Sequence, residues 1–91
     1  MRNDVPMVQY LIWAMEGRGT MSNQAIYKEV RRLCARDNRT LPPNDDAEIR
    51  TTLQAHCSTA PQFAGNRDLF TNPSDGYWLC KVTTPKLEDL L

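Results

Sequence analysis

Two adjacent prolines, Pro42 and Pro43, divide the chain near its middle. Because a residue that precedes proline avoids helical backbone, any helix upstream must end before this point. The following residues, 44–57, begin with Asn44, a good helix cap, and continue with acidic side chains where the helix dipole favours them. These acids are Asp45, Asp46 and Glu48. The pattern predicts a helix over 44–57 with a well-defined start.

The predicted helix has an apolar face and a polar face. Ile49, Leu53 and Cys57 recur at every fourth position and are expected to face the core. The polar face carries side chains that can bind a base edge, a phosphate or a thymine methyl group. They are Arg50, Thr51 and Gln54. This favours a helix that reads the DNA major groove. The competing interpretation is an ordinary amphipathic helix with its arginine paired to Asp46 or Glu29.

The charge of the chain is balanced overall and uneven locally. A net charge of zero argues against a nucleic-acid binder that depends on its total charge. Residues 21–43, however, hold five basic and two acidic side chains. We expect Lys28, Arg31 and Arg32 in this segment to anchor DNA phosphates. A solvated basic face is the usual alternative for such a run.

Apolar residues at helical spacing predict two more helices, over 5–16 and 22–37, with Ser22 as the cap of the second. With 91 residues, the chain is long enough for one domain with a single modest core. The expected core is Leu11, Ile12, Met15, Ile26, Val30, Leu33, Ile49, Leu53, Phe70 and Trp78.

Two β-rich runs around the turn sequence NPSDG predict a hairpin over 68–82. A very short extended step, Thr20-Met21, precedes the second helix. The order helix, extended step, helix, helix, hairpin is that of an α+β winged helix-turn-helix, with the hairpin as the wing. We assign residues 1–82 to this domain and residues 83–91 to a tail or linker.

The expected wing brings further polar side chains toward DNA. Asn66 and Arg67 precede the hairpin, and Ser74 and Asp75 lie at its tip. We expect one of these pairs to meet the flanking DNA backbone or the minor groove.

The three cysteines, Cys34, Cys57 and Cys80, fall at apolar positions, which predicts buried, reduced thiols and a cytoplasmic setting. A Cys₃His zinc site with His56 is the alternative, but no CxxC pair supports it. No signal peptide and no apolar run of membrane-spanning length are visible.

Catalysis by this chain is not expected, and no cofactor is implied. An HNH nuclease needs several metal ligands, whereas the chain has one histidine. The four glycines are not arranged as a phosphate-binding loop.

The C-terminal half resembles the winged-helix domains at the ends of bacterial restriction endonucleases, including those fused to HNH nucleases and the N-terminal domain of Mrr-type enzymes. It is more distantly similar to the HARE-HTH domains of chromatin and DNA-processing proteins. The segments that carry the resemblance are 48–54 (EIRTTLQ), 61–63 (PQF), 68–70 (DLF) and 76–78 (GYW). The first two helices match only in pattern.

The resemblance implies double-stranded DNA binding by a specificity module, fused to or cooperating with a nuclease and with methylated DNA as one candidate target. The acidic start of the third helix argues against close phosphate contact at that helix end. A winged helix that binds another protein, or a small stand-alone transcription regulator, is the alternative.

Overall fold

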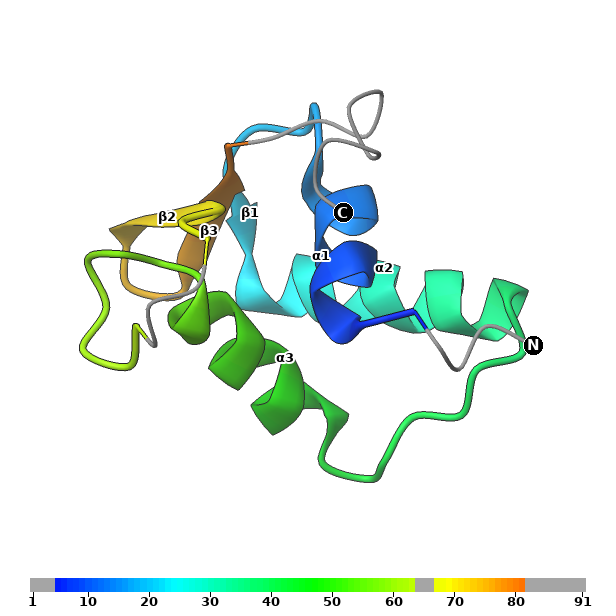
Figure 1. Cartoon of the computed structure of the whole chain (residues 1–91). Helices are drawn as coiled ribbons and strands as arrows, with labels where there is room; N and C mark the ends of the chain where they lie inside the picture. Colours follow the sequence, from blue (N-terminus) through cyan, green and yellow to red (C-terminus); the bar gives the residue numbers. More distant parts are fainter. Residues whose placement is uncertain (1–4, 64–66, 82–91) are drawn as a thin grey trace.

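The computed structural model describes residues 5–63 and 67–81, and these form three helices and a small antiparallel sheet (Figure 1). The elements in chain order are α1 (Met7–Met15), β1 (Met21–Ser22), α2 (Asn23–Arg36), α3 (Asp45–Ala55), β2 (Phe70–Ser74) and β3 (Tyr77–Cys80). The predicted α+β class and the three predicted helices are confirmed.

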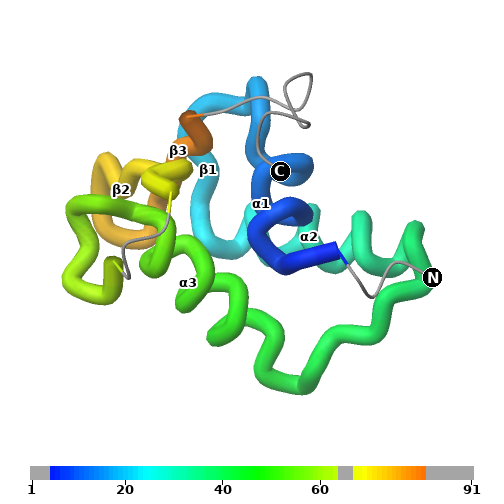
Figure 2. Tube along the Cα trace, viewed as in Figure 1, coloured from blue at the N-terminus to red at the C-terminus, as the bar shows by residue number. Residues whose placement is uncertain are grey.

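The sheet lies at one end of the helices. Helix α2 starts beside it and α3 ends beside it, while the loop 37–44 joins the two helices at the opposite end (Figures 1 and 2). Helix α1 packs against both α2 and α3. The end of α3, the start of α2 and the hairpin therefore meet in one region.

Helix α2 has the predicted cap. The Ser22 hydroxyl accepts a hydrogen bond from the Ala25 N–H at 3.2 Å, which satisfies one of the free donors of the first turn. At the other end Asn38 adopts a left-handed φ of 58°, and the Arg39 N–H donates to the Cys34 carbonyl at 2.8 Å. This closing arrangement satisfies the last carbonyls and ends the helix at Arg36, one residue before the predicted end.

Helix α3 begins where predicted, but its cap differs. Asn44 occupies the capping position, yet its side chain accepts no hydrogen bond from the helix, so the predicted side-chain cap is wrong. The Ala47 N–H instead donates to the Asp46 carboxylate at 2.8 Å. The helix ends at Ala55 because the next amides, including Cys57, bond three residues back and tighten the chain.

Helix α1 is shorter than predicted and begins at Met7, after Pro6 at the capping position. Asp4, which the sequence offers as a cap for this helix, lies outside the described residues. The helix stops at Met15, and Gly17 and Gly19 then reverse the chain with a φ of 69° each, a conformation that glycine adopts at little cost.

The sheet has the order β1-β3-β2, with both pairs antiparallel. The extended step before α2 is thus a true strand: Met21 pairs with Trp78, and Ser22 pairs with Tyr77. The sequence had indicated the step but not its partner.

The turn of the hairpin is tighter than the predicted NPSDG turn. Strand β2 continues through Ser74, with an irregular register after Thr71, and leaves only Asp75-Gly76 in the turn. The Asn72 side-chain amide bridges the irregularity, since its Nδ2 donates to the carbonyls of Ser74 at 2.7 Å and Tyr77 at 2.6 Å. Proline is tolerated in this strand because β2 lies at the sheet edge.

All ten predicted core residues are buried. The core also contains Tyr10, which was not among the predicted core residues but is fully buried. Its hydroxyl donates to the Asp37 carboxylate at 2.8 Å, and the Arg39 guanidinium lies 5.1 Å from its ring centroid. Burial, together with the hydrogen bond to Asp37, raises the pKa of Tyr10. This contact joins α1 to the end of α2.

Replacing Leu53 with alanine should lower the free energy of unfolding by about 2–5 kcal/mol, because it leaves a cavity at a fully buried position. Urea denaturation measures the change. The control is Gln24→Ala on the exposed side of α2, which should shift stability by less than about 0.5 kcal/mol. Equal effects of the two variants would contradict the placement of Leu53.

Candidate nucleic-acid interface

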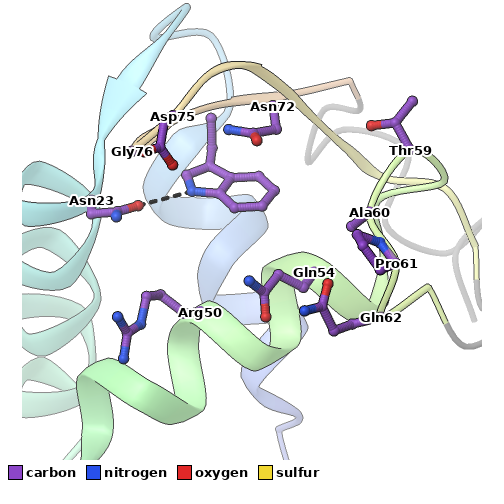
Figure 3. Close-up of a pocket in the computed structure, with 11 residues that line it drawn as sticks. Asn23, Arg50, Gln54, Thr59, Ala60, Pro61, Gln62, Asn72, Asp75 and Gly76 are labelled. Atoms are coloured by element: carbon purple, nitrogen blue, oxygen red, sulfur yellow. Dashed lines mark hydrogen bonds between the residues drawn. The ribbon is translucent and has the colours of Figure 1, made fainter.

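A polar groove of about 370 Å³ lies between α3 and the hairpin (Figure 3). Its walls come from α3, from the loop that follows it, from the hairpin and from the first residue of α2. The lining residues are Asn23, Arg50, Gln54, Thr59, Ala60, Pro61, Gln62, Asn72, Asp75, Gly76 and Trp78.

Asn23 fixes the hairpin wall of the groove to the start of α2. Its backbone N–H donates to the Gly76 carbonyl at 2.9 Å, and its side-chain Oδ1 accepts from the Trp78 indole Nε1 at 2.8 Å (Figure 3). Gly76 has a φ of 80°, which turns the chain so that this carbonyl faces Asn23. The buried indole N–H therefore has the partner that a buried donor requires.

The structure brings two of the predicted reading residues together on the α3 wall. Arg50 is exposed and Gln54 is half-buried, and both line the groove (Figure 3). Thr51 is exposed but outside the lining, and its hydroxyl donates to the Ala47 carbonyl at 2.8 Å. Its methyl group is the part of the side chain left for other contacts.

Arg50 forms no salt bridge and no hydrogen bond within residues 5–63 and 67–81. The described residues therefore do not show the salt bridge from Arg50 to Asp46 or Glu29 that the competing interpretation predicts. Glu29 instead binds Arg18 and Arg32, and Asp46 accepts from the backbone of α3.

The predicted anchors on α2 are mostly neutralised by neighbouring acids. Arg31 binds Asp45 through two hydrogen bonds, from Nε at 2.7 Å and from Nη2 at 2.9 Å. Arg32 binds Glu29 in the same two-point manner. The hydrogen bonds from these arginines lower the pKa of Asp45 and of Glu29. Both carboxylates are thus held ionised against their guanidinium partners.

Lys28 is exposed and has no salt bridge with the described part of the chain. It is therefore the α2 cation that can meet a phosphate without first leaving an acid. The neutralisation of Arg31 was not visible from the sequence because it depends on how α2 and α3 pack.

Asp68 ties the end of α3 to the hairpin. Its carboxylate accepts from the Ser58 backbone N–H at 2.9 Å, from the Ser58 hydroxyl at 2.8 Å and from the Lys81 ammonium at 2.6 Å. The His56 carbonyl adds two more contacts, from the backbone N–H groups of Leu69 and Phe70. These bonds connect the end of α3 and the loop after it to the residues at the base of the hairpin.

The other predicted contacts lie around the hairpin. Arg67 is exposed, and its carbonyl lies 3.1 Å from the His56 Nδ1. Ser74 and Asp75 are exposed at the turn, and Asp75 also lines the groove. Asn66 lies outside the described residues.

Sequence reasoning missed the amide-rich character of the groove. Asn23 was not among the predicted site residues, Asn72 was assigned to the turn, and Gln62 was noted only within the segment 61–63 that carries the resemblance. Asn72 in the turn sequence NPSDG was the available signal, but the sequence alone did not bring the segments together.

Cys34 and Cys57 are buried thiols, as expected, and Cys80 is partly buried. Burial raises the pKa of Cys34. Within the ranges that the structure describes, no three His, Cys, Asp or Glu side chains gather as they would around a metal ion. Over the same ranges each helix is too short or too polar to cross a membrane.

A comparison of the chain with protein-family models, with curated proteins and with solved structures finds no significant match.

The link through Asp68 should make stability depend on pH in the acid range. Its hydrogen bonds with Lys81 and Ser58 lower the pKa of Asp68 from 3.8 to about 2. Its contribution is therefore complete above the unfolded pKa of 3.8 and is lost as the pH falls toward 2. Between about pH 6 and about pH 3, the wild type should lose more unfolding free energy than Asp68→Asn. Parallel urea-denaturation profiles for the two proteins would refute the link.

Proposed function

We propose that this chain is a winged-helix module that binds double-stranded DNA, with α3 in the major groove and the hairpin as the wing. The element order and the sheet order β1-β3-β2 are compatible with that layout. Helix α3 ends beside the hairpin, so the proposed reading helix and the proposed wing lie next to each other (Figure 1).

The observation that carries the proposal is the pair Arg50 and Gln54. They are one helical turn apart, both face the groove beside the hairpin, and Arg50 is not engaged by an acid in the described residues. Arginine and glutamine can each make two hydrogen bonds to a base edge, so side chains one turn apart can address neighbouring base pairs. Thr51 adds a methyl group that can touch the C5 methyl of thymine or methylcytosine.

Phosphate contacts are assigned first to Lys28. Arg31 and Arg32 are assigned second, because each must exchange its carboxylate partner for a phosphate. The side chains of Arg31 and Arg32 are 48% and 61% exposed, whereas those of their partners Asp45 and Glu29 are only 12% and 14% exposed. A phosphate that replaces the carboxylate must offset the cost of leaving this shielded acid without its partner, which is why Lys28 is placed first. Arg67, beside the hairpin, is the proposed contact on the wing side.

The partner protein in this proposal is a nuclease, fused or associated, in a restriction or modification-dependent system. The support is the resemblance of residues 48–54 and 76–78 to winged-helix domains of restriction endonucleases. The chain itself is proposed to recognise DNA and not to cleave it.

A protein partner is the second candidate, and the paired charges of α2 favour it. Arg31 and Arg32 already have acidic partners, and the chain as a whole is neutral. A surface of this kind attracts DNA weakly and suits a protein interface. Absence of DNA binding at low salt would select this alternative.

Alanine at Arg50 or Gln54 should weaken binding to a preferred duplex by about 1–3 kcal/mol and to random duplex by much less. The preferred site is first obtained by selection from random duplexes, and affinities are then measured by fluorescence anisotropy. Gln24→Ala, outside the groove, is the matched amide control. Equal losses on both duplexes would mean that Arg50 and Gln54 touch only the backbone.

Lys28→Ala should weaken binding to all duplexes similarly and flatten the salt dependence by about one unit, because one phosphate contact is lost. The double variant Arg31→Ala, Arg32→Ala should flatten it by about one unit for each exchanged contact. Arg36→Ala, at the end of α2 remote from the sheet, serves as the control (Figure 1). If Lys28→Ala and the double variant both leave the salt dependence of binding unchanged, as the control does, α2 is a solvated face.

A further inference from the structure

The groove contains two side-chain amides whose orientations are fixed by the protein. The Asn23 Oδ1 accepts from the Trp78 indole at 2.8 Å, which leaves its NH₂ group as a donor. The Asn72 Nδ2 donates to the Ser74 and Tyr77 carbonyls, which leaves its Oδ1 as an acceptor. Neither remaining group has another hydrogen bond among the described residues. The hairpin side of the groove thus presents one preset donor and one preset acceptor.

The other polar groups of the groove also provide hydrogen-bond donors and acceptors. Gln62 offers an amide that can rotate to either orientation, and Asp75 offers a carboxylate acceptor. Asp75 offsets the charge of Arg50 across the groove, so the lining does not favour a ligand with many negative charges. Trp78, Ala60 and Pro61 supply the apolar part.

A planar ligand edge with both donors and acceptors and a flat apolar face is the description of a nucleobase. The volume of about 370 Å³ is at the lower end of small-ligand pockets and is enough for one base with its sugar.

We propose that the groove binds a single unpaired nucleotide of a DNA strand, held by Asn23, Gln62, Asn72 and Asp75. This rests on the proposed DNA-binding function, and Arg50 and Gln54 remain with the paired bases next to it. Because Asp75 and Asn72 are acceptors, the groove favours a base with an exocyclic amino group. Cytosine, adenine and guanine have this group, and thymine does not.

The test compares a fully paired duplex with duplexes of the same sequence that carry one extra, unpaired cytosine or thymine. Binding to the whole chain is measured by fluorescence anisotropy. The cytosine bulge should bind about tenfold more tightly than the paired duplex, as expected for one or two added hydrogen bonds. The thymine bulge should lose most of this gain. In an NMR titration, the indole N–H signal of Trp78 should shift with the bulged duplex more than with the paired one.

Two variants and one control assign the effect to the groove. Gln62→Ala should remove the preference for the cytosine bulge and leave the affinity for paired duplex unchanged. Asp75→Asn should remove the same preference, because the carboxylate acceptor is lost. Gln24→Ala, exposed on α2 outside the groove, should leave both unchanged. Thermal melting of each variant checks that it is folded. If a variant is not folded, the comparison of the bulged and paired duplexes with the wild-type chain still tests the proposal.

Equal affinity for bulged and paired duplexes would overturn the nucleotide site and leave the proposed DNA-binding function intact. Absence of binding to every duplex would overturn both. Binding of free deoxycytidine monophosphate as tight as that of the bulged duplex would overturn the assignment to a DNA strand.

Discussion

The hydrogen bond between the Trp78 indole and the Asn23 side chain joins the two halves of the molecule. An indole buried to this extent carries one donor that must be satisfied, and its partner lies 55 residues earlier in the chain. The neighbouring pairs Met21 with Trp78 and Ser22 with Tyr77 set the register of the same junction. Because Asn23 is also the first residue of α2, this side chain ties the start of the helix to the sheet. The groove exists between α3 and the hairpin because this junction holds the hairpin in place.

The second organising feature is the distribution of charge. The chain has equal numbers of acidic and basic side chains, and the fold pairs several of the arginines with acids. The pair between Arg31 and Asp45 connects α2 to the first turn of α3, so it acts as a link between helices as well as a neutralised charge. The groove, by contrast, is lined by four neutral amides and by only one basic and one acidic side chain. Amides provide directional hydrogen bonds with little long-range attraction, so such a surface favours selectivity over strength of binding.

Periodicity in the sequence was enough to predict the three helices and most of the large buried residues, because the apolar residues of α2 and α3 repeat at helical spacing. Ser22 and the residues around the prolines gave the starts of these helices. The pairing of β1 was not predictable, since two residues carry no periodic pattern and their partner Trp78 is distant in sequence. The hairpin turn was misjudged because Asn72 has turn-forming chemistry, but here its amide bridges an irregular strand. Arg31 shows the same limit for the site: its partner Asp45 is set by helix packing.

The pairing of β1 with β3 also has a consequence for the order in which the molecule is assembled. As the chain leaves the ribosome, Met21 and Ser22 are made long before Tyr77 and Trp78, so the central strand of the sheet is the last to arrive. The local helices can form and collapse first, whereas closing the long loop between the two strands requires nearly the whole described chain. Until then β1 is an open strand edge that other chains can reach. Its length of only two residues keeps this waiting edge too short to be a good template for aggregation.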